Sequence, residues 1–581
     1  MKNIIVIDSG FSFTEDNYKN YHSVNGISIQ NDGKKYNYIP QYQDSVGHGS
    51  IVCNLLHQYL TKPIDLFVIN IFPKSESAKI DLLIEALLYC DKYLNCDLIQ
   101  ISLGTLYYNE QLEKIIEKLT NKNILIVAAY DNEKSISYPA AMKSVLGVDI
   151  NSKYSGLDDY DIICDNVIDV RGADVYYRSK GLNNQNYIVR GSSFYCCYIV
   201  AVIINSDLSV LKKTNVVNEL KKKAKKIYNV NSYQHCFPKI EKAVVFPINK
   251  ETQSIATFED YLDFEVLDYF DIREKGLIKK TFCSIFSYID NKKIIKNYKT
   301  IDWNLGFDTF ICGHVGKISE ILKYDVLDEI AEKCNFFKKK LICFDNAAQI
   351  KNKYPDLTIW YPYADVTMVP KCRYGKLRSP HVPILGIFGT SSKQGKMTLQ
   401  LILRSALQKE NIKVKNIGSE PESYLFGFEY LFAFGYEATD YLTQEQTIML
   451  LNEAVYQMER KDCELIIVGS QSGTVPHQLR NIEMIPIKQY SFLLGTQPDA
   501  IILCVNSFDP IDYVERTVAF FHATVGANVI AICLSDFTKK SRKNSSDYVN
   551  QVQKHFGVPT FNLENLDVKR LVDSIVEYYQ E

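Results

Sequence analysis

The sequence predicts an α/β protein with parallel sheets, divided into several domains. Short apolar runs alternate with longer helical patterns along the chain, which is typical of parallel strands connected by helices. With 581 residues the chain is too long for one hydrophobic core. Apolar residues make up 46% and charged residues 23% of it, which indicates a globular protein and excludes a disordered or fibrous one.

The first domain is expected over residues 1–205. Four apolar runs predict its buried strands, at residues 4–7, 66–71, 97–101 and 124–129. Two helical patterns lie among them, at residues 79–94 and 110–120. Because helical patterns connect the apolar runs, we expect a parallel sheet with helices packed on its faces.

Three further parts are expected after the first domain. A lysine-rich helical linker is predicted over 206–240, a small α/β domain over 241–372 and a third α/β domain over 383–581. The small domain is expected to contain strands at 243–247, 309–312 and 340–344 and a helix at 317–333. The third domain is expected to contain strands at 384–388, 464–468, 500–505 and 528–534.

Charge and cysteine usage limit the partners that we expect. The 66 Lys plus Arg nearly balance the 68 Asp plus Glu, so no overall field attracts nucleic acid or an anionic membrane. The 15 cysteines are scattered and show no paired spacing typical of zinc sites. No apolar run approaches the length of a membrane span, and the chain starts with a strand rather than a signal peptide. We therefore expect a cytoplasmic protein with reduced thiols, bound to neither nucleic acid nor membrane.

Three residues of the first domain have the chemistry of a serine hydrolase. Such an enzyme needs a hydroxyl, an imidazole that takes its proton and a carboxylate that orients the imidazole. Asp8 ends the first predicted strand, and His48 lies between two glycines. Ser193 begins the apolar run 194–204, which predicts a buried helix whose N-terminus would favour developing negative charge.

The order of these residues resembles that of the subtilisin family, in which Asp precedes His and His precedes Ser. The resemblance implies that Asp8, His48 and Ser193 form a catalytic triad. It also implies that the segment Ile101-Ser102-Leu103-Gly104 binds an extended substrate peptide by pairing along a strand edge, with Ser102, Leu103 and Gly104 as substrate-binding residues.

The residue that completes the oxyanion site stays open between two neighbours. The segment 126–133 resembles the part of the family that carries the side-chain donor, and one alignment places Asp131 there while a shift of one residue places Asn132. Only Asn132 has an amide to donate. The chain departs from the family at Ile51, where a second histidine is usual, and at Cys197, where a proline is usual.

A second constellation follows the strand at 384–388. The segment Gly389-Thr390-Ser391-Ser392-Lys393-Gln394-Gly395-Lys396-Met397-Thr398 leads into a helical pattern, which is the strand, loop and helix context of a phosphate-binding loop. It resembles the loop of dethiobiotin synthetase-like P-loop proteins. The resemblance implies that ATP or GTP with Mg²⁺ binds to Gly389, Thr390, Gly395, Lys396, Met397 and Thr398.

The metal ligands are less clearly marked. The strand at 464–468 is followed by Gly469 and Ser470, where a P-loop enzyme often has a carboxylate. This leaves Thr398 and Glu420, or else Glu422, as candidate groups for the metal.

Residues 240–581 resemble a clostridial protein family that is associated with maturation of small, ribosomally made peptides. The stretches that carry this resemblance are 243–247, 389–398, 466–476 and 500–509. Together the patterns predict an intracellular subtilisin-like serine endopeptidase with a nucleotide-binding module, which cleaves a ribosomally synthesised precursor peptide such as a bacteriocin precursor. The precursor would bind as an extended strand, and a second copy or another maturation enzyme would be the protein partner.

Two alternatives remain open from the sequence. The main activity could be a nucleotide-dependent kinase or ligase reaction, with the protease-like domain only binding the leader peptide. Alternatively, the chain could be a nucleotide-switched scaffold in which neither site turns over rapidly.

Overall fold

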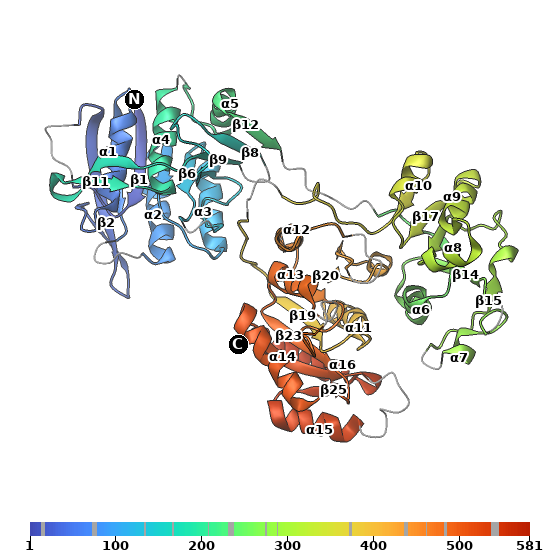
Figure 1. Ribbon diagram of the computed structural model, residues 1–581. Coiled ribbons are helices and arrows are strands. Elements are labelled where there is room, and N and C mark those ends of the chain that lie inside the picture. Colours follow the sequence, from blue (N-terminus) through green and yellow to red (C-terminus); the bar gives the residue numbers. More distant parts are fainter. Residues whose placement is uncertain are drawn as a thin grey trace. The chain divides into compact units, whose positions relative to one another are not determined.

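The structure is a computed structural model that describes most of the chain in two compact units (Figure 1). Unit 1 comprises Met1–Ser232 and Lys371–His381, and unit 2 comprises Tyr233–Pro370 and Val382–Glu581. The described residues are 1–12, 18–72, 78–132, 135–164, 168–206, 208–229, 237–273, 276–286, 289–370, 375–434, 440–459, 462–480, 485–535 and 545–580.

Unit 1 is built on a ten-stranded, mostly parallel sheet with the order β12-β8-β9-β7-β6-β5-β1-β4-β2-β3. Its strands are β1 (Lys2–Asp8), β2 (Tyr21–Asn31), β3 (Tyr36–Ile39), β4 (Ile64–Asn70), β5 (Leu98–Ile101), β6 (Leu125–Ala129), β7 (Leu146–Asn151), β8 (Asp161–Cys164), β9 (Ile168–Ala173) and β12 (Lys226–Asn229). A separate hairpin joins β10 (Tyr177–Lys180) to β11 (Asn186–Val189).

Helices cover both faces of this sheet because alternate side chains of each strand point to opposite faces. The helices α1 (His48–Tyr59) and α4 (Ser192–Asn205) pack with Ile4 and Val6 of β1 in one core. The helices α2 (Ile80–Tyr93) and α3 (Glu110–Asn121) pack with Ile5 and Ile7 in the other. Unit 1 also contains α5 (Lys213–Lys223).

Unit 2 contains two sheets, in which all registered strand pairs are parallel. The middle sheet has the order β15-β14-β13-β16-β17-β18. Its strands are β13 (Lys242–Phe246), β14 (Glu265–Asp271), β15 (Ile295–Asn297), β16 (Thr309–Cys312), β17 (Lys340–Cys343) and β18 (Ile359–Trp360). The helices of this part are α6 (Lys250–Thr257), α7 (Phe282–Ile285), α8 (Gly316–Leu322), α9 (Val326–Phe336) and α10 (Ala348–Lys353).

The C-terminal sheet has the order β21-β20-β22-β19-β23-β24-β25. Its strands are β19 (Ile384–Gly389), β20 (Val414–Gly418), β21 (Tyr430–Leu431), β22 (Leu465–Gly469), β23 (Ala500–Val505), β24 (Asn528–Leu534) and β25 (Thr560–Asn562). Its helices are α11 (Lys396–Lys409), α12 (Gln444–Glu459), α13 (Ile487–Thr496), α14 (Ile511–Val525), α15 (Ser545–Phe556) and α16 (Val568–Gln580).

The structure confirms the predicted α/β class, and the strands and helices that the apolar runs predict are present except for one helix. The single helix predicted over 317–333 is wrong. The chain leaves the helix at Lys323, which adopts a left-handed conformation with φ 60°. Asp325 then caps a new helix, since its carboxylate accepts hydrogen bonds from the amides of Leu327 and Asp328.

The stretch predicted as a helical linker also contributes to the sheet of unit 1. Its helix α5 is followed by β12, which pairs in parallel with β8. The domain boundaries given above stay a prediction. None of the described helices is long and apolar enough to cross a bilayer.

Candidate active site and candidate nucleotide site

Asp8 and His48 form a hydrogen-bonded pair at the carboxyl end of β1. His48 Nδ1 lies 2.8 Å from Asp8 Oδ1 and 3.1 Å from Oδ2. The side chain of Asp8 is 2% exposed and that of His48 is 35% exposed. A buried carboxylate that accepts the Nδ1 proton leaves Nε2 as the basic nitrogen of the imidazole.

Burial lowers the pKa of His48, but Asp8 and then Asp44 stabilise the imidazolium. The net result is a pKa above the ordinary value of about 6.5. His48 is therefore neutral, and able to act as a base, only at a pH above that value.

The loop that carries His48 is fixed by a buried carboxylate that the sequence patterns did not reveal. Asp44 is 4% exposed. Its Oδ1 accepts from Ser9 Oγ (3.0 Å), Val46 N (2.9 Å) and Gly47 N (2.8 Å), and its Oδ2 from the amide and hydroxyl of Ser50 (2.8 and 2.7 Å). Each of these donors would otherwise lack a partner, at a cost of about 1–3 kcal/mol. Asp44 thereby fixes both ends of the turn around the imidazole.

The glycines that flank His48 are required by local geometry. Gly47 precedes α1 with φ 100°, a conformation that residues with a Cβ rarely adopt. A Cβ at Gly49 would lie 2.2 Å from the carbonyl oxygen of Gly10. Any larger residue at position 49 would push α1, and with it His48, away from β1.

Ser193 lies in the first turn of α4 and is 6% exposed. Its hydroxyl donates to the carbonyl of Ser102 over 3.1 Å. No hydrogen bond joins it to His48 in the described part of the chain, although the ring of the next residue, Phe194, lies 5.3 Å from the imidazole centroid. The three predicted triad residues thus lie in one region, with the serine hydroxyl turned toward β5.

Of the two oxyanion candidates, the structure brings Asn132 beside the start of α4. Asn132 Oδ1 accepts from the amide (2.9 Å) and the hydroxyl (3.0 Å) of Ser192. A Cβ at Gly191, which has φ 146°, would lie 2.7 Å from the same oxygen. The backbone amide of Asp131 donates to Ser137 Oγ over 2.8 Å. The contact with Ser192 places Asn132 beside the start of α4, and its role as the oxyanion donor stays a prediction.

The predicted substrate-binding segment directly follows β5, which ends at Ile101. The carbonyl of Ser102 accepts the Ser193 hydroxyl. The backbone groups of Leu103 and Gly104 have no hydrogen-bond partner among the described residues. They are therefore available to pair with an extended peptide.

The two residues that depart from the subtilisin pattern, Cys197 and Ile51, are buried in the core. Cys197 is fully buried, and its thiol lies 3.3 Å from the carbonyl of Ser193 and from Gln100 Nε2. Ile51 belongs to α1 and is 7% exposed, packed in the core. Both residues thus pack within the helices that carry His48 and Ser193.

The predicted phosphate loop connects β19 to α11. The amides of residues 392–398 have no hydrogen-bond partner in the described part of the chain. Gly395 caps α11 with φ 71°, and a Cβ there would lie 2.3 Å from Leu563 Cδ2. A run of unpaired amides at a helix N-terminus is the arrangement that binds phosphate groups.

Lys396 lies inside this loop, where it is 7% exposed. Its Nζ donates to the carbonyl of Ser391 over 2.7 Å. Burial lowers the pKa of Lys396 to about 8. A phosphate at the loop would compensate for the burial of this charge.

Gln394 stabilises the loop through two side-chain hydrogen bonds. Its Oε1 accepts from the Ser391 amide (2.9 Å) and its Nε2 donates to Thr390 Oγ1 (2.6 Å).

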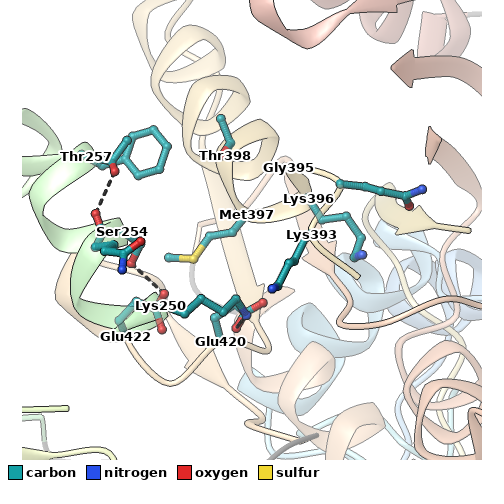
Figure 2. A pocket seen from close by; sticks show the side chains of 13 residues that line it. Lys250, Ser254, Thr257, Lys393, Gly395, Lys396, Met397, Thr398, Glu420 and Glu422 are labelled. Atoms are coloured by element: carbon teal, nitrogen blue, oxygen red, sulfur yellow. Dashed lines mark hydrogen bonds and ion pairs between the residues drawn. The ribbon is translucent and has the colours of Figure 1, made fainter. Parts of the chain in front are cut away.

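A cavity of about 430 Å³ lies between the loop and α6, as Figure 2 shows. Gly395, Lys396, Met397 and Thr398 line it together with Glu420 and Glu422. Gly389 and Thr390 lie at the base of the loop, where Thr390 Oγ1 donates to Asp509. The opposite wall comes from α6, whose Lys250 and Ser254 the sequence analysis missed because they lie about 150 residues away along the chain.

The predicted metal groups share this cavity. Glu420 Oε2 accepts from Lys250 Nζ (2.9 Å) and from Gln471 Nε2 (3.0 Å). Among the described residues no cluster of three or more His, Cys, Asp and Glu could hold a metal ion. One hydroxyl, from Thr398, and one carboxylate fit a Mg²⁺ ion that takes its other ligands from phosphates and water.

Glu422 has a different environment from Glu420. It is 2% exposed, and its Oε1 accepts from Ser254 Oγ over 2.7 Å while Oε2 has no partner among the described residues. Burial, and next the charges of Glu420 and Glu251, raise the pKa of Glu422 well above its usual range. Protonation, which this environment favours, would let Glu422 donate a hydrogen bond into the cavity.

Comparison with known proteins supports two regions of similarity. Residues 372–572 match the family described as "Domain of unknown function (DUF1611_C) P-loop domain". The minor extracellular protease Epr of Bacillus subtilis (strain 168) is 25% identical over 175 residues, which are 28% of this chain and 25% of that protease. The chain thus spans about a quarter of the length of this curated relative.

Two solved structures overlap with different parts of the chain. A DUF1611 family protein from Anabaena variabilis covers 58% of this chain and 99% of its own, with 12% identity and a TM-score of 0.45. A cold-adapted subtilisin-like serine proteinase covers 35% of this chain and 73% of its own, with 15% identity and a TM-score of 0.28. Similarity at these TM-scores assigns no activity. The family match assigns a P-loop domain to residues 372–572, and the match to the Bacillus protease gives the N-terminal region distant similarity to a subtilisin-like protease.

The Asp8–His48 pair predicts the pH dependence of serine reactivity. Because the pKa of His48 is raised, labelling of Ser193 by a fluorophosphonate should increase with pH and reach half its maximal rate above pH about 6.5. The Asp8→Asn variant should move this midpoint downward and slow labelling on the order of 10⁴-fold, because the imidazole loses its orienting carboxylate. Asp65→Asn, which alters an exposed His–Asp pair with His22, should leave the profile unchanged. An Asp8→Asn profile identical to that of the wild type would contradict the assignment.

The position of Asn132 predicts which neighbour stabilises the oxyanion. Asn132→Ala should lower kcat about 10²–10³-fold with little change in KM, since its donor acts only on the developing charge. Asp131→Ala should change kcat by less than about 10-fold. Steady-state cleavage of a peptide substrate measures both values. A larger loss of kcat in Asp131→Ala than in Asn132→Ala would reverse the choice.

Proposed function

We propose that unit 1 is a serine endopeptidase in which Ser193 is the nucleophile. The observation that supports this most strongly is the 2.8 Å contact between His48 Nδ1 and the buried carboxylate of Asp8, with Ser193 on the adjacent helix α4. The similarity to a Bacillus protease over 175 residues supports the same chemistry. Asp8 orients the imidazole, and His48 Nε2 accepts the proton of the Ser193 hydroxyl.

The reaction begins with a change at Ser193. Its hydroxyl leaves the carbonyl of Ser102 and turns toward His48, a rotation about one side-chain bond. The Ser193 oxygen attacks the scissile carbonyl, and the amide of Asn132 with the backbone amide of Ser193 stabilises the oxyanion. His48 then gives its proton to the leaving amine, and water releases the acyl group by the reverse sequence.

We propose that the substrate is a precursor peptide, ribosomally made, that binds as an extended strand along Leu103 and Gly104. The free backbone groups of that segment support strand pairing, which recognises backbone rather than sequence. We further propose that the protein acts in the cytoplasm, with a second copy or another maturation enzyme as its protein partner, and binds neither nucleic acid nor membrane.

We also propose that unit 2 binds ATP or GTP with Mg²⁺ at the loop 389–398. The unpaired amides of residues 392–398 would hold the phosphates, and Lys396 would neutralise part of their charge. Thr398 and Glu420 would hold Mg²⁺, which when bound stabilises charge on the phosphate oxygens. Glu422 would line the cavity beside Glu420, and Lys250 of α6 would lie on the opposite wall.

A second candidate function is supported by the contact between Ser193 and Ser102. A hydroxyl held by a carbonyl rather than by an imidazole suits a domain that binds a leader peptide without cleaving it. In that case the main reaction would be a nucleotide-dependent kinase or ligase step in unit 2.

Substitution of Ser193 separates these two functions. The wild type should be labelled at Ser193 by a fluorophosphonate and should trim short precursor peptides encoded near its gene, as mass spectrometry would show. Ser193→Ala should lose both activities, with trimming reduced at least on the order of 10³-fold. Ser152→Ala, at an exposed site of unit 1, should behave as the wild type. Continued trimming by Ser193→Ala would exclude the endopeptidase and favour leader binding.

Lys396 allows a test of the nucleotide site. Both tryptophans of the chain, Trp303 and Trp360, lie in unit 2, so tryptophan fluorescence during heating reports on that unit. Nucleotide with Mg²⁺ should raise the unfolding midpoint of the wild type. Lys396→Ala should weaken nucleotide affinity about 10–100-fold, because a charged hydrogen bond contributes about 1.5–3 kcal/mol.

The control for this experiment is Lys409→Ala, at the exposed far end of α11, which should bind nucleotide as the wild type does. Since the pKa of Lys396 is about 8, wild-type affinity should also fall as the pH rises above about 8. Unchanged affinity in Lys396→Ala would contradict nucleotide binding at this loop.

A further inference from the structure

Gln100 is a polar residue in an otherwise apolar strand that leads to the candidate active site. The strand β5 reads Leu-Ile-Gln-Ile. The register partners of Gln100 are Val6 of β1 and Val127 of β6, which both belong to the core that contains α1 and α4. Gln100 itself is fully buried. Because partners in register lie on the same face of a sheet, its amide faces the helices that carry His48 and Ser193.

The amide of Gln100 bridges the end of β5 and the helix α4. Its Nε2 donates to Ser102 Oγ over 3.2 Å and to Cys197 Sγ over 3.3 Å. Ser102 begins the predicted substrate-binding segment, and Cys197 lies one helical turn after Ser193. An amide nitrogen has two hydrogens, so it can make both contacts at once.

These contacts are part of a ring of hydrogen bonds that includes the nucleophile. The Cys197 thiol donates to the carbonyl of Ser193 over 3.3 Å, and the Ser193 hydroxyl donates to the carbonyl of Ser102 over 3.1 Å. The two bonds from Gln100 complete the ring. None of the four residues is more than 6% exposed. The ring therefore fixes the spacing between Ser193 and the segment that starts at Ser102, away from competing water.

The oxygen of the Gln100 amide makes no such contact. Oε1 is buried and accepts no hydrogen bond from the described residues. A buried acceptor without a partner costs free energy, and an apolar side chain of similar size would avoid that cost. Stability alone therefore does not explain an amide at this position, whereas its two donated bonds join parts of the candidate active site.

The bridge also gives a reason for one departure from the subtilisin pattern. Cys197 occupies a position at which a proline is usual in that family. A proline side chain has neither a donor nor an acceptor, so it could not join the ring. The thiol of Cys197 does both, because it accepts from Gln100 and donates to Ser193. The cysteine and the buried glutamine are thus matched to each other in this chain.

A peptide must meet two elements of unit 1 at the same time. Its backbone would pair with Leu103 and Gly104, whose backbone groups have no hydrogen-bond partner among the described residues. Its scissile carbonyl must also lie within reach of Ser193 in the first turn of α4. The spacing between the segment after β5 and α4 therefore decides whether a bound peptide is aligned for attack.

We propose that Gln100 is a positioning residue, which holds the substrate-binding segment and α4 at a fixed spacing through Ser102 and Cys197. When the Ser193 hydroxyl turns from the carbonyl of Ser102 to His48, the direct bond between the two elements is lost. The bridge through Gln100 then keeps the bound peptide in line with the nucleophile. This role rests on the endopeptidase function proposed for unit 1.

Two reagents separate positioning from a purely structural role. A peptide substrate uses both the segment after β5 and Ser193, whereas a small alkyl fluorophosphonate reacts with Ser193 without pairing along a strand. In the full chain, Gln100→Leu should lower kcat/KM for peptide cleavage on the order of 10–100-fold, mainly through kcat, because the scissile carbonyl is misplaced. Labelling of Ser193 should slow by less than about 3-fold. The unfolding midpoint from circular dichroism should not fall, since leucine removes the unpaired buried oxygen.

Cys197 allows a second test of the same bridge. Cys197→Ala should lose as much cleavage as Gln100→Leu, and the double variant should lose no more than either single variant. Cys197→Ser keeps a group that accepts and donates, so it should cleave the peptide within about 3-fold of the wild type. Cys196→Ala is the matched control, because Cys196 is fully buried in α4 and lies outside the ring.

The outcomes distinguish this role from the function on which it rests. Equal losses of cleavage and labelling in Gln100→Leu, together with a lower unfolding midpoint, would show that Gln100 only supports the fold and would overturn the proposal. Wild-type cleavage by Gln100→Leu would also overturn it, while the endopeptidase function would stand. If the wild type is neither labelled at Ser193 nor able to cleave a peptide, the endopeptidase function is wrong and the role of Gln100 falls with it.

Discussion

The carboxyl ends of parallel strands meet at one edge of a sheet, and this constraint positions the candidate functional groups of both units. In unit 1, Asp8 ends β1, Ser102 follows β5 and Asn132 follows β6. These strands are neighbours in the order β6-β5-β1, so residues more than a hundred positions apart reach one place. In unit 2 the phosphate loop follows the central strand β19, and Glu420 follows β20. Because the sheet rather than a flexible loop supports these side chains, their geometry is fixed although they are largely buried.

At these edges, buried carboxylates fix the orientation of neighbouring side chains and turns. Asp8 orients the imidazole, Asp44 holds the turn before it, and Asp271 holds the guanidinium of Arg273. An ionised group removed from water costs several kcal/mol unless it is paired or hydrogen-bonded. Each of these carboxylates accepts two or more hydrogen bonds, so the burial penalty is offset and the partner is fixed in one orientation.

Sequence patterns predicted the elements and the residues that end strands, because both depend on local periodicity. The strand at 500–505 and the strand at 528–534 have the expected bounds. The break at Lys323 was missed because the apolar period continues across it, while one left-handed residue changes the direction of the chain. Turn conformation of this kind is set by tertiary packing and leaves little trace in composition.

Contacts between distant segments could not be predicted in the same way. The choice between Asp131 and Asn132 depends on which side chain meets Ser192, and no spacing encodes that contact. Asp44 belongs to no recognisable motif, although it lies four residues before His48. The wall that Lys250 and Ser254 add to the nucleotide cavity depends on how α6 packs against the loop that precedes α11.

Residues 375–381 lie in unit 1, although β18 before them and β19 after them in the chain belong to unit 2. Within unit 1 the Nζ of Lys376 lies 2.7 Å from Asp149 Oδ1, and their side chains are 8% and 6% exposed.

Two further contacts hold this segment in unit 1. The same Nζ lies 5.1 Å from the ring centroid of Tyr130, and His381 stacks on Tyr108 with centroids 4.4 Å apart. Releasing the segment would break a buried ion pair, which costs about 3–5 kcal/mol when one partner is left behind. The strand β19, which leads into the phosphate loop, begins only three residues after His381. The buried Lys376–Asp149 pair therefore keeps these residues in unit 1 until shortly before β19 begins.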